Sequence, residues 1–336
     1  MKVLVTGSAG LIGSNFCHYL LDNVPNIHIV GIDNLSGGLN MAENMPENIH
    51  FIKGDLANKE DQSTIEQCFK DGYIDYIFNF AAFAACGNSG FMRQHTYINN
   101  CVINAFLINM AITYEIKRFV YTSSMAVYGH GVPPFTEDLI PNPNDTYGIA
   151  KFASEMDLRV AYEQHNLEYC IIRPHNVFGK YQNLSDPYRN VLAIWMHQAM
   201  NNLPLTIYGD GEQTRSFSYI DDCLPCLWNA AVMVGAKNQI INVGGKSFIS
   251  LKKAAELIKT ITGSHKVVHL EPRHEVKHAW SSYQKSIDVL NYQEITSLQQ
   301  GIQLMWEWAR QQPIRERKFF SRYEIDSNIY SYWKLE

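Results

Sequence analysis

The chain of 336 residues has a composition that excludes several classes of protein. Apolar residues make up 46% and charged residues 18%, with 21 glycines and 12 prolines, which is typical of globular proteins and not of disordered or fibrous ones. The 28 basic and 33 acidic side chains give a net charge of −5 without a basic cluster, so we expect no nucleic-acid partner. No apolar run reaches the roughly 18 residues of a membrane span, and the N-terminal apolar stretch is interrupted at Thr6 and Gly7. We therefore expect a soluble, cytoplasmic protein of about two domains with no membrane partner.

Short β-branched runs alternate with helical patterns through the first half of the chain. The expected strands are residues 2–6, 27–32, 50–53, 76–80, 118–122 and 169–173. The expected helices are residues 11–21, 63–69, 98–113 and 147–165. Continuous apolar strands that alternate with helices are typical of a parallel sheet covered on both faces. Residues 1–175 are therefore predicted to form a doubly wound α/β domain of the Rossmann type.

The alternation loosens beyond residue 175. Residues 183–189 and 201–212 are rich in turn formers, and helical patterns follow at 191–200, 223–234, 251–261 and 298–310. We expect residues 176–336 to form a smaller α+β domain that lies across the carboxyl edge of the sheet and binds the substrate. One strand near residues 240–243 is expected to return to the large domain. The aromatic tail from Phe319 is expected to pack on the protein's own surface rather than to serve as a partner-binding arm.

The first expected strand runs into a glycine-rich turn. Gly7 and Gly10 allow a tight turn and a close approach of the backbone to a ligand, and Gly13 lets the helix pack on the strand. The helix N-terminus then offers N–H groups and the positive end of a dipole to a pyrophosphate. Asp33, at the end of the second strand, can bind both ribose hydroxyls and would repel a 2′-phosphate. The pattern predicts an NAD site and disfavours NADP.

Tyr147 and Lys151 have the i, i+4 spacing that places two side chains on one face of a helix. Tyrosine has an unperturbed pKa of about 10, but a neighbouring ammonium and the positive nicotinamide of NAD⁺ would both favour the phenolate. The pair is therefore a candidate acid/base device, although the same spacing also occurs on ordinary solvated helix faces. Ser124 follows the preceding strand, at the edge where open α/β sheets bind ligands, and its hydroxyl can bridge a substrate hydroxyl to the tyrosine.

In combination, these motifs resemble those of a known family. Thr-Gly-x-x-Gly-x-x-Gly at 6–13, Ser-Ser-x-x-Val-Tyr-Gly at 123–129, Tyr-x-x-x-Lys at 147–151 and Asn-Val-Phe-Gly at 176–179 are similar to those of the extended short-chain dehydrogenase/reductases. Within that family the chain resembles the nucleotide-sugar epimerases and dehydratases, best the UDP-glucose 4-epimerase type. The resemblance extends from Lys2 to about Arg310. It implies a homodimer formed by helices that correspond roughly to residues 98–113 and 147–165.

The resemblance implies how NAD is held. It assigns the pyrophosphate to Gly7, Gly10, Ile12 and Gly13; the adenosine ribose to Asp33 and Asn34; the adenine to Asp55 and Leu56; the nicotinamide half to Phe80, Ala81, Ala82 and Asn99; and its ribose to Tyr147 and Lys151. One position departs from the family. Members of the family frequently have a lysine at the position of Ala84 in this chain. NAD is therefore expected to be held less tightly than in members that never release it.

The resemblance also implies a nucleotide-sugar substrate, with a UDP-sugar expected. It assigns the sugar and its surroundings to Ser124, Met125 and Ala279; the diphosphate to Asn176, Arg215 and Arg273; the base and ribose to Asn190, Val191, Leu205 and Tyr208; and the ribose also to Glu275. A guanidinium suits the diphosphate because it is permanently charged and binds phosphate in a bidentate manner. Residues 272–276 are one residue out of step with the family's Arg-Pro-Gly-Asp-Val, so Arg273 and Glu275 are assigned with a shift of one residue.

Residues that are missing narrow the expected reaction. Where the 4,6-dehydratases carry Asp-Glu, the decarboxylases a glutamate and the 3,5-epimerases a cysteine, this chain has Met125 and Ala126. We therefore expect a C4 epimerase in which Tyr147, helped by Ser124, takes the C4 hydroxyl proton. Ala279 stands where glucose-restricted epimerases tend to have a bulky aromatic residue. This leaves room for an N-acetyl group or another bulky substituent, unless the neighbouring Trp280 refills the space.

Several alternatives stay open. The chain could be a dehydratase of the same fold with unrecognised acid/base residues, or a non-catalytic NAD-binding regulatory protein, although the latter would be free to lose its tyrosine, lysine and serine. The pairs His265/His269 and His274/His278 have a spacing that suits zinc, but no glutamate base or third ligand accompanies them, so no metal is expected. Residues 223–226 form a Cys-x-x-Cys sequence without thioredoxin-like surroundings, and we expect these cysteines to serve packing.

Overall fold

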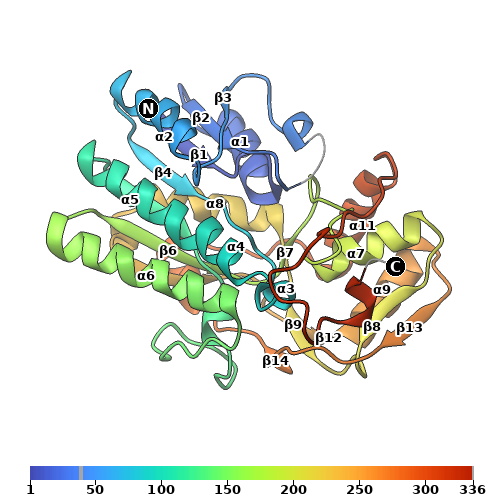
Figure 1. Cartoon of the computed structure of the whole chain (residues 1–336). Coiled ribbons are helices and arrows are strands. Elements are labelled where there is room, and N and C mark those ends of the chain that lie inside the picture. Colours follow the sequence, from blue (N-terminus) through green and yellow to red (C-terminus); the bar gives the residue numbers. More distant parts are fainter. Residues whose placement is uncertain (38–40, 335–336) are drawn as a thin grey trace.

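A seven-stranded parallel sheet forms the centre of the computed structural model, which describes residues 1–37 and 41–334 (Figure 1). Its strands lie in the order β11-β6-β5-β4-β1-β2-β3. Their bounds are β1 Lys2–Thr6, β2 His28–Asp33, β3 His50–Lys53, β4 Tyr76–Asn79, β5 Arg118–Thr122, β6 Tyr169–Pro174 and β11 Gln239–Val243. The chain runs outward from β1 to β3 and then resumes on the other side of β1 with β4, so the strand order reverses between β1 and β4. This confirms the predicted Rossmann-type sheet and locates its topological switch point, where such folds bind ligands.

Helices cover both faces of the sheet and bury alternate side chains of each strand. On β1, Val3 and Val5 belong to one hydrophobic core and Leu4 to another on the opposite face. The covering helices are α1 (Leu11–Asn23) and α8 (Ile220–Val232) on the first face, and α2 (Lys59–Lys70), α5 (Ile103–Thr113) and α6 (Thr146–His165) on the second. Because both faces are buried, the strands are continuously apolar.

Three helices begin at least two residues away from where the sequence predicts. Helix α2 begins at Lys59 rather than at residue 63, with Asn58 as its N-cap. The expected helix 98–113 is divided, because Arg93–Tyr97 form α4 and Ile98–Val102 form a π-helical turn before α5 begins. Such turns keep the side-chain spacing close to that of an α-helix, so the pattern does not reveal them, and they are frequent at functional sites. Helix α8 begins at Ile220, ahead of the expected residue 223, with two aspartates in its first turn, where the helix dipole favours negative charge.

The second half of the chain forms smaller sheets and helices beyond the carboxyl end of β6. In the described part of the chain, the strand pairs are β7 (Val177–Phe178) with β10 (Ser218–Tyr219), β8 (Leu205–Tyr208) with β13 (Val267–Leu270), and β9 (Thr214–Ser216) with β12 (Phe248–Ser250) and β14 (His278–Ala279). The remaining helices are α3 (Cys86–Ser89), α7 (Val191–Met200), α9 (Leu251–Thr262), α10 (Gln284–Leu290) and α11 (Leu298–Ala309). Strand β8 lies inside the stretch 201–212 that the sequence suggests to be turns. Strand β11 instead joins the central sheet and pairs in parallel with β6.

The chain beyond α11 crosses back over the molecule, past α3, as the red trace of Figure 1 shows. Tyr323, Ile329 and Trp333 are buried there, in a cluster that also contains Phe83 and Tyr188. The tail therefore packs on the protein's own surface, as the sequence predicts. Within the described residues, none of the helices combines the length and the apolar character needed to cross a membrane.

Candidate active site

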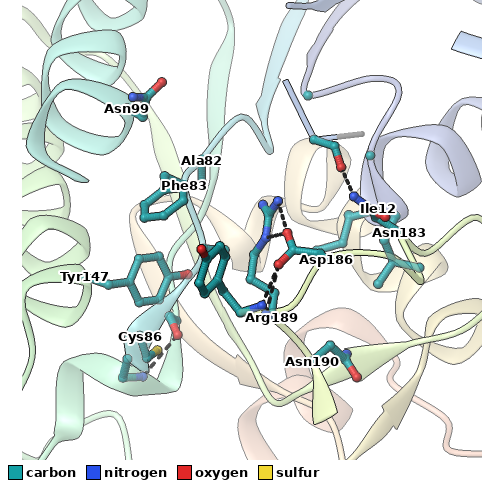
Figure 2. Close-up of a pocket in the computed structure, with 18 of the residues that line it drawn as sticks. Ile12, Ala82, Phe83, Cys86, Asn99, Tyr147, Asn183, Asp186, Arg189 and Asn190 are labelled. Carbon is teal, nitrogen blue, oxygen red and sulfur yellow. Dashed lines mark hydrogen bonds and ion pairs between the residues drawn. The ribbon is translucent and has the colours of Figure 1, made fainter. Parts of the chain in front are cut away.

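A cavity of about 1030 Å³ at the switch point of the sheet brings together most of the predicted site residues (Figure 2). The volume is at the upper end of the range for small-molecule sites, which suits two extended ligands. The predicted residues that line it are Gly7, Gly10, Ile12, Gly13, Asp33, Asn34, Asp55, Leu56, Phe80, Ala81, Ala82, Asn99, Ser124, Met125, Tyr147, Lys151, Asn176, Asn190, Val191, Arg215, Arg273, Glu275 and Ala279.

The glycine-rich turn leaves no room for side chains where β1 meets α1. Gly7 has a φ of +64°, and a Cβ on it would lie 2.8 Å from the Ala81 nitrogen. A Cβ on Gly13 would lie 2.1 Å from the Gly7 carbonyl oxygen. The N-cap of α1 is Gly10, and no side chain caps this helix, whereas Asn58 accepts hydrogen bonds from two backbone N–H groups at the start of α2. The first N–H groups of α1 thus lack a side-chain acceptor and face the cavity, which fits a diphosphate.

Asp33 is held with its carboxylate at the edge of the cavity. It accepts hydrogen bonds from the backbone nitrogens of Ala9 (3.0 Å) and Leu35 (2.7 Å). Burial raises its pKa, and these two hydrogen bonds oppose the rise. Because a carboxylate accepts about four hydrogen bonds, Asp33 keeps the capacity to bind the hydroxyls of a ribose. The amide of Asn34 donates to the Asp55 carboxylate (3.1 Å), which ties the predicted ribose and adenine positions together.

Tyr147 and Lys151 lie in the first two turns of α6. Asp145 caps this helix by accepting a hydrogen bond from the Gly148 nitrogen (2.8 Å). The Lys151 ammonium lies 5.9 Å from the centre of the Tyr147 ring and donates to the carbonyl of Thr122 (2.7 Å). Both side chains line the cavity, as the i, i+4 spacing predicts for two residues on one helix face.

Burial dominates the ionisation of this pair. It raises the pKa of Tyr147 well above its usual value, and the Ser124 hydroxyl opposes part of that rise. Burial lowers the pKa of Lys151 to about 7, although Cys101 and Glu155 act in the opposite direction. The expected lowering of the Tyr147 pKa by Lys151 is therefore not found in the chain alone. The physical reason is that the enclosure that disfavours the phenolate also disfavours the charge on the lysine.

A buried polar network that sequence reasoning missed supports α6 from below. The Glu155 carboxylate, one turn after Lys151, accepts hydrogen bonds from Arg173 at its Nε (2.9 Å) and Nη2 (2.5 Å). The Ser123 hydroxyl donates to the same carboxylate. Arg173 also donates to the Tyr128 hydroxyl (2.8 Å). Since Arg173 lies on β6 and Ser123 directly after β5, the network joins the helix with the candidate catalytic residues to the strand ends at the cavity.

On the predicted substrate side, one carboxylate lies between two arginines. Glu275 accepts a hydrogen bond from Arg215 (2.8 Å) and lies 3.5 Å from Arg273 Nε. Arg215 also donates to the Val276 and Lys277 carbonyls (2.8 and 3.2 Å). The three side chains together carry a net charge of about +1. The sequence expectation placed Glu275 at a ribose, and the structure places its carboxylate between the two guanidinium groups instead.

Two predicted substrate residues do not line the cavity. Leu205 is fully buried in the hydrophobic core, since alternate side chains of β8 point inward. The ring of Tyr208 is covered by the Arg273 guanidinium at 4.6 Å and by the Tyr332 ring at 4.6 Å. The expected contact of Leu205 with a nucleotide base is therefore wrong, and Tyr208 supports Arg273 rather than facing the cavity.

Ala279 lines the cavity although it is only 1% exposed, because it packs in a hydrophobic cluster with Val127, Tyr128 and Phe135. Trp280 stacks on Phe248 with ring centres 4.0 Å apart and is not among the residues that line the cavity. The sequence left open whether Trp280 refills the space next to Ala279; the Trp280 ring lies on Phe248, outside the cavity lining.

Sequence reasoning missed an ion pair that lies in the middle of the cavity. In Figure 2 the Asp186–Arg189 pair lies between Tyr147 and Phe83 on one side and Ile12 on the other. The Arg189 Nε donates to the Asp186 carboxylate (2.5 Å). These residues belong to the stretch 183–189, whose turn formers predict a loop but not what the loop faces. Cys86 and residues of the C-terminal tail also line the cavity, and no sequence motif predicted that they would.

The histidine and cysteine patterns form no separate site. His269 lies in strand β13, so the spacing to His265 does not place the two on a helix face. Cys223 and Cys226 are both buried in α8, and burial raises the pKa of each thiol. Among residues 1–37 and 41–334, no cluster of three or more His, Cys, Asp or Glu side chains could hold a metal ion.

Comparisons with known proteins agree with this geometry. Residues 3–244 match the family described as the NAD dependent epimerase/dehydratase family. The uncharacterised UDP-glucose epimerase YtcB of Bacillus subtilis is 29% identical over 313 residues, which cover 90% of this chain and 96% of the relative. The UDP-glucose 4-epimerase of Thermotoga maritima, whose structure was solved with UDP-glucose, is 30% identical and superposes with a TM-score of 0.85. The match covers 92% of this chain and 99% of the epimerase chain. The UDP-glucuronic acid 4-epimerase of Bacillus cereus, solved with UDP-glucuronic acid and NAD, is also 30% identical, with a TM-score of 0.84 and coverage of 93% and 99%.

Proposed function

The chain belongs to the NAD dependent epimerase/dehydratase family, and on this premise we propose that it is an NAD-dependent nucleotide-sugar 4-epimerase that acts on a UDP-hexose. The observation that carries the proposal is that the glycine turn, Ser124 and Tyr147 line one cavity, while Met125 and Ala126 provide no second acid/base group beside them. The similar solved structures include 4-epimerases with UDP-glucose and with UDP-glucuronic acid.

The residues of the first half fit NAD. The uncapped N-terminus of α1 would hold the pyrophosphate, the free acceptor capacity of Asp33 the adenosine ribose, and residues 80–82 with Asn99 the nicotinamide half. When bound, NAD⁺ supplies a hydride acceptor for C4 of the sugar and returns the hydride later, so no net oxidation results. A positive nicotinamide bound near Tyr147 would oppose the effect of burial on the pKa of the phenol.

Proton transfer is the task of Tyr147 and Ser124. Tyr147 takes the proton of the C4 hydroxyl while the Ser124 hydroxyl bridges the sugar and the phenol, and the same proton is given back after the sugar has turned. Lys151 holds the Tyr147 side of the cavity through its hydrogen bond to the Thr122 carbonyl and supplies positive charge whenever it is protonated. Epimerisation requires that the 4-keto sugar turn while the nucleotide stays in place. Arg215 and Arg273 hold the diphosphate in this proposal, and Asn176 lines the same cavity and donates to the carbonyl of Ser216, the residue after Arg215.

The small side chain of Ala279 at the cavity wall favours a sugar with a bulky substituent. Ala279 contributes only a methyl group to the lining, and the Trp280 ring stacks on Phe248 outside it, so neither side chain projects toward the sugar. A UDP-N-acetylhexosamine or UDP-glucuronate therefore fits the proposal better than an unsubstituted hexose alone.

A face of α6 favours a homodimer. Ile149, Met156 and Val160 recur at the spacing of one helix face and are 40–42% exposed, and Val102 beside α5 is 48% exposed. We propose that two copies of the chain bury this face against each other. Light scattering should then give twice the mass of the chain, and Val160→Glu should shift it to the monomer.

Product analysis tests the reaction. The purified protein is incubated with UDP-glucose, UDP-N-acetylglucosamine and UDP-glucuronate, and the products are examined by proton NMR and mass spectrometry. An epimerase yields the C4 epimer with unchanged mass, whereas a dehydratase loses water and the C6 hydroxyl. A protein that binds NAD tightly but turns over none of a broad panel would be the non-catalytic alternative.

A further inference from the structure

The C-terminal segment of residues 313–333, here called the strap, runs along the cavity and contributes to its lining. At its start the Arg317 Nη2 donates to the Ile194 carbonyl (3.1 Å), and the Arg315 carbonyl lies 2.7 Å from His197 Nε2. Both partners belong to α7. The strap therefore begins on the helix that follows the loop containing Asp186 and Arg189.

The middle of the strap fastens that loop. The Phe320 nitrogen donates to the Tyr188 hydroxyl (2.8 Å), which also lies 2.7 Å from the Tyr323 hydroxyl. The rings of Tyr188 and Phe320 stack with their centres 5.4 Å apart. Since Tyr188 precedes Arg189 directly, these contacts fix the position of the residue whose guanidinium lies in the cavity.

The far end of the strap is tied to two other walls. The Glu324 carboxylate accepts hydrogen bonds from the backbone nitrogens of Gln94 (2.7 Å) and His95 (2.8 Å) at the start of α4. The Tyr330 hydroxyl accepts a hydrogen bond from the His274 nitrogen (2.7 Å), next to Arg273. Trp333 is 1% exposed and anchors the end. The strap thus connects α7, the 186–190 loop, α4 and the arginine-bearing loop, which surround the cavity.

The strap also contributes side chains to the cavity. Those that line it are Arg315, Glu316, Lys318, Phe319 and Phe320. Lys318 is exposed, and no hydrogen bond or ion pair joins it to another residue in the described part of the chain. The arginines of the cavity walls differ in this respect, because Arg215 and Arg273 share Glu275 and Arg189 is paired with Asp186. A diphosphate carries about two negative charges. Because Glu275 and Asp186 already neutralise part of the charge of the wall arginines, these arginines leave part of the diphosphate charge without a partner.

We propose that the strap is part of the active site and that Lys318 binds the diphosphate of a nucleotide there, either that of NAD or that of the nucleotide sugar. The proposal rests on the proposed function for the identity of the two ligands. The proposal requires a cation in the cavity that has no protein partner, and Lys318 is such a cation in the described part of the chain. It also requires that the segment carrying this cation be fixed to the cavity walls, which the hydrogen bonds of the strap provide. Glu316, two residues earlier, also lines the cavity, and its carboxylate offsets the charge of Lys318. Removing Lys318 would therefore leave the strap with a negative charge at the cavity, which should weaken the binding of a diphosphate.

Binding measurements on the full chain test the proposal. The dissociation constants of NAD⁺ and of UDP are measured separately by calorimetry for the wild type, Lys318→Ala and Lys318→Arg. The matched control is Lys334→Ala, which removes an exposed lysine one residue beyond the strap. Loss of a charge-assisted contact should weaken one of the two ligands about tenfold in Lys318→Ala. Lys318→Arg should stay close to the wild type, and Lys334→Ala should change neither. Weaker NAD⁺ binding identifies the cofactor as the ligand of Lys318 and weaker UDP binding the substrate; unchanged binding of both overturns the assignment.

A second variant tests the fastening. Glu324→Ala removes the acceptor of two backbone N–H groups on α4, and we expect faster trypsin cleavage after Lys318 than in the wild type, with protection by NAD⁺ plus UDP in the wild type. Cleavage at the same rate with and without both ligands would show that the strap does not cover them. Neither measurement needs turnover, so a protein that binds one of the two nucleotides through Lys318 but epimerises no sugar would refute the proposed function and leave this inference intact.

Discussion

Glu155 and Arg173 form an ion pair inside the protein, with Arg173 Nη2 2.5 Å from Glu155 Oε2 and neither side chain more than 2% exposed. Arg173 lies on β6 and Glu155 on α6, one turn after Lys151, so the pair fixes the helix that carries the candidate catalytic residues against the sheet. Such a pair costs much free energy if one partner is lost, because the other is then left as an uncompensated buried charge.

Glu155→Gln should therefore lower the free energy of unfolding by about 3–5 kcal/mol, measured by urea denaturation. The control is Glu256→Gln, which breaks an exposed pair with Lys259 on α9, where the Glu256 side chain is 61% exposed. Exposed pairs contribute about 0–1 kcal/mol, so this variant should unfold close to the wild type. Equal effects of the two variants would contradict the structural role of the buried pair.

Tyr147→Phe should reduce kcat by about 10²–10⁴-fold, because the C4 hydroxyl would lose its proton acceptor, while binding of the nucleotide sugar is kept. The matched control is Tyr121→Phe. Tyr121 is buried, and the centre of its ring lies 4.8 Å from the Lys151 ammonium. It does not line the cavity, so its hydroxyl should be dispensable for turnover. Full activity of Tyr147→Phe would rule out the proposed proton transfer.

The buried Lys151 should make the stability of the ligand-free chain depend on pH. Its pKa is about 7 in the folded chain, against 10.5 for an ordinary lysine. Below pH 7 the side chain is protonated in both states and the full cost of burying the ammonium is present. As the pH rises from 7 towards 10.5, the unfolded state binds more protons than the folded one, so the free energy of unfolding increases, by at most about 1.4 kcal/mol per pH unit.

Lys151→Met removes this charge. The excess stability of the variant over the wild type should be largest at pH 6 and should shrink by about 1–3 kcal/mol by pH 9 in denaturation experiments. Lys70→Met, whose lysine side chain is 51% exposed, should show no such trend. A constant difference between Lys151→Met and the wild type across this range would mean that Lys151 titrates like an exposed lysine.

Gly13→Ala should weaken NAD⁺ binding, because the new Cβ would lie 2.1 Å from the Gly7 carbonyl oxygen and would force the turn at the N-terminus of α1 apart. We expect a loss of affinity of at least about tenfold by calorimetry, since the diphosphate depends on these N–H groups. Gly90→Ala meets nothing within 4 Å and should bind NAD⁺ like the wild type. A Gly13→Ala protein with unchanged affinity would show that NAD⁺ does not use this turn.

Ala279→Tyr should restrict the sugar. A ring at this position would project from the wall into the cavity, so kcat/KM for UDP-N-acetylglucosamine should fall at least about tenfold more than kcat/KM for UDP-glucose. Measuring both substrates with one preparation provides the internal control, because general damage would lower both values alike. A parallel fall would place the substituent elsewhere.

The sequence was sufficient for the parts of the fold and the site that depend on local patterns. The glycine spacing, Asp33 after its strand and the i, i+4 pair Tyr147 and Lys151 each reflect a backbone geometry that a few neighbouring residues determine, and the structure brings them to one cavity. The sequence did not predict the π-helical turn that carries Asn99, because the side-chain spacing of such a turn differs little from that of an α-helix.

What the sequence could not provide depends on long-range packing. The ion pair of Arg189 with Asp186 lies in a stretch that turn formers identify as a loop, but the surface that the loop faces is set by the rest of the fold. The ionisation of Tyr147 shows the same limit, because burial by distant segments outweighs the adjacent lysine. Lys318 lies beyond the part of the chain that resembles the family, so no motif pointed to it.

Strand β11 has a consequence for the colloidal behaviour of the chain. It supplies one outer edge of the central sheet, paired along its length with β6 from residue 170 to 174. A fragment without the second half would expose the N–H and C=O groups of β6 as an open edge, the kind of surface on which strands of other chains add. The second half of the chain therefore does more than complete a binding site: it shields the sheet against intermolecular pairing and aggregation.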